Sequence, residues 1–197
     1  MNTVHPQLSI IIPAAGASER LGQPKQLVQY KGKSLIRKAI ENAESLAPDE
    51  IIVVTGADAD AVQAEVKKTT AKGVYNPNWR DGMGTSIAFG AKAVDDRSDG
   101  ILILLCDQWQ IQAEDLQLLL KAWQTDPGYI VCAVTRDRHG PPVIFPVSCL
   151  QELRGLSGDH GARSILDSAP DKIKPVTIKH AAFDLDTPFQ LEELNQA

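Results

Sequence analysis

The sequence contains little cysteine, and its cysteines are not spaced as metal ligands. Among 197 residues there are three, Cys106, Cys132 and Cys149, each in or beside an apolar segment. An odd, scattered set of this kind is typical of small buried hydrophobic residues in a reducing compartment. The cysteines therefore argue against a disulfide framework and against a cysteine-bound metal.

Excess positive charge and long apolar runs are also missing. The formal net charge is −5 at pH 7, whereas a general nucleic-acid binder normally carries a basic surface. No apolar stretch of the sequence approaches the roughly 20 residues that a membrane-spanning helix needs. No basic region followed by an apolar run marks a signal peptide. We therefore expect a cytoplasmic protein whose partners are neither nucleic acids nor membranes.

The two commonest phosphate-binding motifs are absent as well. A P-loop requires Lys after its second glycine, where this chain has Gln23 after Gly22. The Gly-x-Gly-x-x-Gly fingerprint of dinucleotide-binding proteins does not occur in the sequence. Its absence argues against a nicotinamide-dependent dehydrogenase.

A different glycine-containing loop near the N-terminus is the strongest functional signal of the chain. In residues 10–25 an apolar run passes into small residues and is followed by Arg20 and Lys25. Small side chains let a phosphate approach backbone N–H groups, and two cations can meet its charge. The loop predicts a nucleoside triphosphate site. A closely packed β-to-α turn without a ligand is the alternative.

Apolar runs alternate with helix-like segments along the chain, which predicts an α/β fold. The predicted strands are 8–13, 51–55, 73–76, 101–105, 129–134 and 173–178, and the predicted helices are 34–47, 58–68, 85–95 and 112–124. Repeated β-α units with continuous apolar strands indicate a mainly parallel sheet that is covered on both faces. Because no linker or repeat is visible, we expect one domain over residues 1–197.

The pattern changes in the second half of the chain. Glycine and proline at 140–142 precede a short apolar run, which predicts a hairpin-like excursion or an edge strand within 136–149. A helix pair is expected around 147–168, broken at 155–161. Pro188 opens a short final helix.

Carboxylates are expected to meet at the site. Asp107 follows the apolar strand 101–105, where a carboxylate is costly unless it meets a cation. Because ligands of parallel sheets bind beyond the carboxyl ends of the strands, Asp107 is a predicted Mg²⁺ ligand, with a turn or N-cap role as the alternative. Asp184 and Asp186 point the same way on an extended segment and could complete that site. Alternatively, Asp186 or Thr187 caps the last helix.

A second glycine-rich loop spans residues 76–86 and joins a predicted strand to a predicted helix. Thr85 and Ser86 lie near the start of that helix, where they could bind an anion or a sugar hydroxyl. Many loops have this composition, so the composition of this segment alone does not establish a binding role.

Six elements in the same order resemble the molybdenum cofactor cytidylyltransferase (MocA-like) family of nucleotidyltransferases. They are Pro13-Ala-Ala-Gly-Ala-Ser-Glu-Arg-Leu-Gly-Gln-Pro-Lys25, Gly82-Met-Gly-Thr-Ser86, Asp107-Gln-Trp109, Gly140-Pro-Pro142, Gly158-Asp-His-Gly-Ala-Arg163 and Asp184-Leu-Asp-Thr-Pro188. The chain departs from the family pattern at Pro13, where Leu is usual, at Trp109, where Pro is usual, and at His160, where Lys is frequent. In the family, the last two positions lie on the acceptor side of the site.

The resemblance implies a Rossmann-like three-layer α/β sandwich of the nucleotide-diphospho-sugar transferase type. It also implies Mg²⁺-dependent transfer of CMP from CTP to the phosphate of molybdopterin cofactor, with release of pyrophosphate. Ala14 and Ala15 favour CTP, since the related branch that uses GTP has glycines there. An attacking phosphate monoester, with a second pKa near about 6, is largely dianionic at neutral pH and needs no general base.

The resemblance further implies which residues act. Arg20, Lys25 and Asp107 are expected in catalysis, and Asp107 and Asp186 are expected to hold the metal. The residues expected to bind nucleotide are Ala14, Ala15, Gly16, Ala17, Arg20, Lys25, Gly84, Thr85 and Ser86. Those expected to bind the acceptor are Gly140, Pro142, Asp159 and Arg163.

Two alternatives stay open. The protein could be a nucleotidyltransferase for another small phosphorylated acceptor, such as methylerythritol phosphate or a sugar phosphate, with CTP or GTP as donor. It could also be a nucleotide-binding chaperone that delivers the cofactor to a molybdoenzyme. Measuring pyrophosphate release distinguishes the two, because a transferase releases pyrophosphate, whereas delivery alone requires no metal-bridged phosphates and no turnover.

Overall fold

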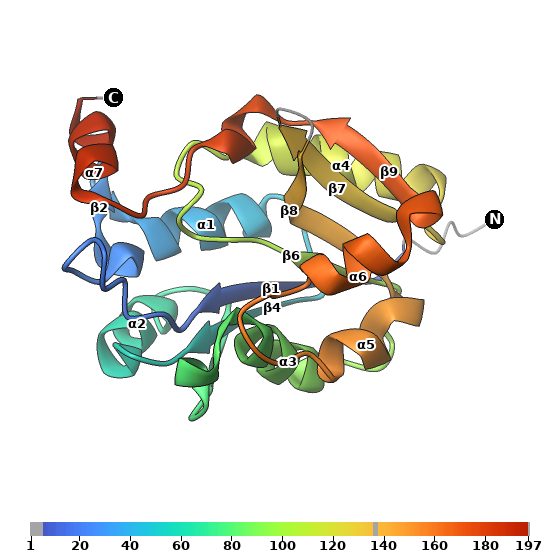
Figure 1. Cartoon of the computed structure of the whole chain (residues 1–197), viewed down its shortest axis with the longest axis horizontal. Coiled ribbons are helices and arrows are strands. Elements are labelled where there is room, and N and C mark those ends of the chain that lie inside the picture. The colour runs from blue at the N-terminus through green and yellow to red at the C-terminus, as the bar shows by residue number, and fades with distance from the viewer. Residues whose placement is uncertain (1–5, 136–137, 197) are drawn as a thin grey trace.

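The computed structural model describes residues 6–135 and 138–196. Seven strands form one sheet in the order β5-β4-β1-β6-β8-β7-β9, with helices on both faces, and β2 and β3 form a small separate sheet (Figure 1). The strands are β1 (Leu8–Ala14), β2 (Gln29–Tyr30), β3 (Lys33–Ser34), β4 (Glu50–Thr55), β5 (Lys72–Tyr75), β6 (Gly100–Ile103), β7 (Ile130–Thr135), β8 (Arg138–Pro146) and β9 (Ile173–Thr177). Four of the six strand pairs in the large sheet are parallel, which confirms the predicted α/β class.

Seven α-helices and five short 3₁₀ helices connect the described strands. The α-helices are α1 (Leu35–Glu44), α2 (Ala59–Val66), α3 (Met83–Ala93), α4 (Ala113–Thr125), α5 (Leu150–Arg154), α6 (Arg163–Ser168) and α7 (Pro188–Asn195). The 3₁₀ helices are η1 (Lys25–Leu27), η2 (Trp79–Asp81), η3 (Val147–Cys149), η4 (Pro170–Lys172) and η5 (Lys179–Ala182). The expected helix pair is confirmed as α5 and α6. Within the described ranges, no helix has both the length and the apolar character needed to cross a membrane.

β1 runs through the middle of the parallel part of the sheet. All of its residues are buried, and it pairs in parallel with both β4 and β6. Ile10 and Ile12 belong to an apolar cluster that includes α1 and α4, whereas Ile11 belongs to a second cluster that includes α3 and α5. Successive side chains of a strand point to opposite faces, so a strand covered on both faces requires a continuous apolar run.

β8 contradicts the expectation of an edge strand. It lies inside the sheet, antiparallel to β6 on one side and to β7 on the other. Its pairing with β7 agrees with the hairpin alternative, although residues 136–137 lie outside the described residues. The pairing of β7 with β8 shifts between Cys132 and Ala133, at the point where Pro141 and Pro142 occur in β8. Because prolines lack an N–H group, their place at this irregularity leaves Val143 and Ile144 able to pair with both β6 and β7.

Gly100, the first residue of β6, allows close packing of α4 on the sheet. A Cβ at this position would lie 2.4 Å from Cζ2 of Trp123, an indole that is fully buried. We expect Gly100→Ala to lower the free energy of unfolding by about 1–3 kcal/mol through overpacking. Denaturant unfolding measures this, with Gly128→Ala as control, since a Cβ there would meet no described atom within 4 Å. Equal stability of the two variants would contradict the packing argument.

Candidate active site

The candidate site lies where the parallel neighbours β1 and β6 end. Residues that follow these strands emerge at the same edge of the sheet, where open α/β sheets bind ligands. A cavity of about 580 Å³ opens at this edge. The sequence-predicted residues that line it are Ala15, Gly16, Ala17, Arg20, Lys25, Ser86, Asp107, Asp159 and Asp186.

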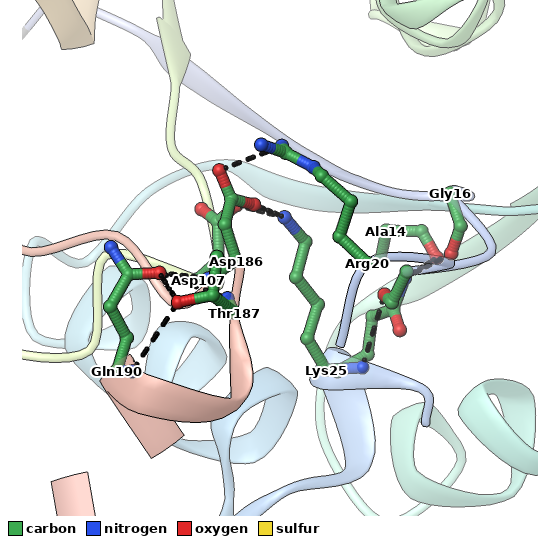
Figure 2. Close-up of polar contacts among 10 residues, drawn as sticks. Ala14, Gly16, Arg20, Lys25, Asp107, Asp186, Thr187 and Gln190 are labelled. Carbon is green, nitrogen blue, oxygen red and sulfur yellow. Dashed lines mark hydrogen bonds and ion pairs between the residues drawn. The ribbon is translucent and has the colours of Figure 1, made fainter. Parts of the chain in front are cut away.

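Lys25 connects two carboxylates in this cavity. Its Nζ donates to Oδ2 of Asp107 at 2.5 Å and to Oδ1 of Asp186 at 2.9 Å, and Arg20 donates to the other oxygen of Asp186 at 3.0 Å (Figure 2). Burial alone would lower the pKa of Lys25, but the charges and hydrogen bonds of the two carboxylates raise it above its usual value. For Asp186 burial acts in the opposite direction and raises the pKa. The hydrogen bonds and charges of Lys25 and Arg20 outweigh this effect, so the pKa of Asp186 lies below its usual value. Lys25 and Asp186 are therefore both charged at neutral pH.

Asp107 presents an oxygen that fits a metal ligand. It is 8% exposed, and its Oδ1 is buried without a hydrogen-bond partner among the described residues. An unpaired buried carboxylate oxygen is costly unless a cation approaches it. Among the described residues, no group of three or more His, Cys, Asp or Glu side chains is arranged to hold a metal. The carboxylates of Asp107 and Asp186 therefore suit a cation that takes its remaining oxygen ligands from substrate phosphates and water, as Mg²⁺ does.

Asp184 lies beside these carboxylates, but it is not among the described residues that line the cavity. Its backbone forms an isolated bridge with Gln108. Burial, followed by the negative charges of Asp107 and Asp186, raises the pKa of Asp184 to about 6. The third carboxylate thus adds to the negative potential that Lys25 and Arg20 offset.

Asp186 is not the cap of the last helix. The N-cap of α7 is Thr187, whose side chain accepts from the backbone N–H of Gln190, with Pro188 in the first turn. The Gln190 side-chain oxygen in turn accepts the backbone N–H groups of Asp186 and Thr187, both at 2.9 Å (Figure 2). This capping box fixes the backbone of Asp186 and leaves its carboxylate to face Lys25.

Gln26 shapes the loop after β1, although no sequence pattern singled it out. The side chain is buried, and its amide donates to the carbonyl oxygens of Ala14 at 3.2 Å and Gly16 at 2.8 Å. These bonds fold residues 14–26 back on themselves and bring Lys25 over the end of β1. A Cβ at Gly16 would meet no described atom within 4 Å, so the backbone there faces open space. Such space is what an approaching phosphate requires.

Ser86 lines the cavity, whereas Gly84 and Thr85 are engaged elsewhere. The Asn76 side chain donates to the hydroxyls of Thr85 at 3.0 Å and Ser86 at 3.1 Å. The backbone N–H of Gly84 donates to the carbonyl of Gly158 at 2.8 Å. α3 begins at Met83, two residues before the predicted start, and Gly82 (φ 104°) is its N-cap residue. The contacts of Gly84 and Thr85 are structural ones that hold α3 against its neighbouring loops.

The expected acceptor residues are dispersed. Among the described residues, Asp159 alone of the four lines the cavity. Gly140 and Pro142 lie on β8, and the exposed Arg163 begins α6, with Nε 3.8 Å from Asp167. The structure therefore brings together the predicted nucleotide and metal residues more closely than the predicted acceptor residues.

Trp79 and Arg80 are among the cavity residues that sequence reasoning missed. The Arg80 guanidinium lies over the Trp79 ring at 4.2 Å. Both fall in the second glycine-rich loop, so that loop was the available signal. Trp109, noted above as a departure from the family pattern, is buried below the site, whereas His160 is exposed.

The family profile described as "MobA-like NTP transferase domain" matches residues 10–173. The chain is 32% identical to nicotine blue oxidoreductase of Paenarthrobacter nicotinovorans over 84% of each protein. It is 26% identical to the purine catabolism protein PucB of Bacillus subtilis over 98% of each.

Solved structures show the same fold. Rv0371c from Mycobacterium tuberculosis superposes with a TM-score of 0.85 at 25% identity, covering 98% of this chain and 99% of that one. Rv0371c has also been solved in complex with manganese. CMP:2-keto-3-deoxy-manno-octonic acid synthetase, solved with CTP, superposes at a TM-score of 0.76 and 19% identity, covering 96% and 97% of the two chains.

The cavity at the ends of β1 and β6 falls within the matched range, apart from Asp186 in the C-terminal segment. The chain belongs to the MobA-like NTP transferase domain family, and the resemblance drawn from the six sequence elements is confirmed at that level: the protein is a nucleotidyltransferase.

Proposed function

We propose that the protein transfers CMP from CTP to the phosphate of molybdopterin cofactor and releases pyrophosphate. The observation that carries the proposal is the placement of Lys25 between Asp107 and Asp186, at the mouth of a loop with open space at Gly16. This arrangement combines cations for phosphates with carboxylates for a metal. Phosphoryl-type transfers depend mainly on such positioning and charge stabilisation.

Asp107 and Asp186 would hold a divalent cation, for which we propose Mg²⁺. The buried unpaired oxygen of Asp107 supports this assignment, as does the manganese complex of the structurally similar Rv0371c. When bound, the cation supplies positive charge shared among phosphate oxygens. Asp107 is held in place by its own backbone, whose carbonyl accepts the N–H groups of Trp109 at 2.9 Å and Leu185 at 3.0 Å.

Lys25 and Arg20 bind the negative charge of the triphosphate and of the departing pyrophosphate. In the structure both cations are paired with carboxylates, so they are held ready at the position that phosphates approach. The backbone around Gly16 would cradle the phosphates, and Asp159, which lines the same cavity, would contact the acceptor. The acceptor phosphate attacks the α-phosphorus in line, and being largely dianionic it requires no base from the protein.

The proposal is tested by measuring pyrophosphate release. The protein is incubated with Mg²⁺ and each of the four nucleoside triphosphates, and with molybdopterin cofactor, a sugar phosphate, methylerythritol phosphate or no acceptor. We expect release with CTP only when the cofactor is present. Release with a sugar phosphate or methylerythritol phosphate instead would favour another acceptor. Binding of CTP and cofactor without release would favour the delivery chaperone.

An oxidoreductase is the second candidate, because the relative at 32% identity carries that name. The missing dinucleotide fingerprint and the paired carboxylates oppose it. Consumption of a reduced nicotinamide cofactor in the presence of an electron acceptor, without any nucleoside triphosphate, would support this candidate.

The choice of base is proposed to depend on Ala14 and Ala15. Both are buried at the end of β1, and a Cβ at Gly56 would lie 2.7 Å from the Ala15 Cβ, so space there is limited. We expect Ala14→Gly combined with Ala15→Gly to shift preference from CTP toward GTP by roughly 10-fold or more, the effect of a methyl-sized change in a pocket. Competition between the two nucleotides measures it. Ala17→Gly is the control, and an equal shift in that variant would contradict the assignment.

A further inference from the structure

A third apolar cluster lies beneath the candidate site, and we call it the Trp109 cluster. Its buried members are Leu21, Val28, Leu35, Trp109, Leu185 and Leu194. Trp109 has the largest side chain among them and is 5% exposed. The ring of Trp109 also meets the rings of Tyr30 and Phe183 edge-on, with centroids 5.2 Å and 6.3 Å away.

The Trp109 cluster joins the two segments that carry the site's charges. Leu21 lies in the loop between Arg20 and Lys25, and Leu185 directly precedes Asp186. Both segments lie outside the strands of the seven-stranded sheet, so the sheet alone does not set the distance between them. Figure 2 shows Lys25 and Arg20 reaching from one side toward Asp107 and Asp186 on the other.

The backbone of Trp109 is hydrogen-bonded to Asp107, which also binds the backbone of the Leu185 segment. The N–H of Trp109 donates to the carbonyl of Asp107 at 2.9 Å, and the N–H of Leu185 donates to that same carbonyl at 3.0 Å. Gln108 forms the isolated bridge with Asp184. Trp109 therefore bonds through its backbone to Asp107, meets Phe183 on the segment that leads to Asp186, and shares its cluster with Leu21 of the loop that presents Lys25.

We infer that Trp109 is a positioning residue that holds Asp186 at ion-pair distance from Lys25, and not an acceptor-binding residue. A smaller side chain would leave a cavity into which the C-terminal segment can shift. Misplacement by about 1 Å can cost on the order of 10²-fold in the function of a preorganised site. Measuring CTP binding rests on the proposed function, whereas measuring the contribution of the ion pair to stability does not.

The ion pair is tested by its contribution to stability in three chains. Asp186→Asn is introduced into the wild-type protein, into Trp109→Leu and into Trp123→Leu, and the midpoint of thermal unfolding is measured for each. Trp123 is the matched control, because it is equally apolar and fully buried but belongs to the cluster with α1 and α4. We expect Asp186→Asn to lower the midpoint in the wild-type and Trp123→Leu chains, and to lower it much less in Trp109→Leu. Equal losses in all three chains would overturn the inference.

Binding of CTP with Mn²⁺, measured by calorimetry on the same chains, gives a second readout. We expect Trp109→Leu to weaken binding by about 10–100-fold, Trp123→Leu to leave it unchanged, and Trp109→Phe, which keeps an aromatic ring, to restore most of it. Equal weakening in both leucine variants would mean that Trp109 contributes only to general stability. A wild-type chain that binds no CTP contradicts the proposed function, while the unfolding experiment still decides the positioning role.

Discussion

Asp107→Asn is expected to reduce metal-dependent CTP turnover by at least about 10²–10³-fold, the scale of losing one preorganised electrostatic group. Asparagine has nearly the same shape, so the backbone carbonyl at this position keeps the N–H groups of Trp109 and Leu185. What is lost is the negative charge that faces Lys25 and that makes the buried oxygen suited to a metal. The fold is therefore expected to persist while the chemistry fails.

The measurement is the Mg²⁺ dependence of pyrophosphate release, with circular dichroism as the check on folding. Asp126→Asn is the matched control, since Asp126 also pairs with a lysine, Lys174, at 2.5 Å but lies outside the cavity lining. That control should keep wild-type turnover. Good activity of Asp107→Asn with unchanged Mg²⁺ dependence would remove Asp107 from the metal site.

Lys25→Ala is expected to lower turnover by about 10²–10³-fold. The ammonium is held by both carboxylates and is the cation nearest to the predicted metal ligands. Its removal leaves Arg20 as the remaining partner of Asp186 and takes a charge away from the triphosphate site. The variant is also expected to bind Mn²⁺ more tightly in the absence of nucleotide, because the ammonium no longer competes for the carboxylate oxygens.

Lys33→Ala is the control for this effect. Lys33 lies on the nearby strand β3, is exposed and pairs with Glu41 at 2.6 Å. If turnover depended on general positive charge, both variants would lose it. Pyrophosphate release by Lys25→Ala at the wild-type rate would falsify the catalytic assignment.

Much of the fold was predictable because its signals are local. A strand buried on both faces, such as β1, must be a continuous apolar run, and the turn after it must contain small residues. For β8 the hairpin alternative agrees with its antiparallel pairing to β7, whereas the edge-strand alternative was wrong: Pro141 and Pro142 suggest an edge, but they lie at an irregularity of the β7–β8 pairing, which only the tertiary structure reveals. Val143 and Ile144, which follow these prolines, are buried and pair with both β6 and β7.

The site was predictable in its parts but not in its contacts. Sequence motifs identified Lys25, Asp107 and Asp186, yet these residues are separated by 82 and 161 positions along the chain. Their meeting depends on Gln26, which folds the loop, and on Trp109, which packs beneath it. Neither side chain carries a pattern that distinguishes it from an ordinary loop or core residue.

The most direct test follows the phosphorus atoms of CTP. The protein is incubated with Mg²⁺, molybdopterin cofactor and CTP labelled either at the α-phosphate or at the γ-phosphate, and the products are separated. Nucleotidyl transfer at the cavity of Lys25, Asp107 and Asp186 predicts α-label in the cofactor and γ-label in pyrophosphate. Transfer of the γ-label to the cofactor, or release of the α-label as free CMP, would contradict it.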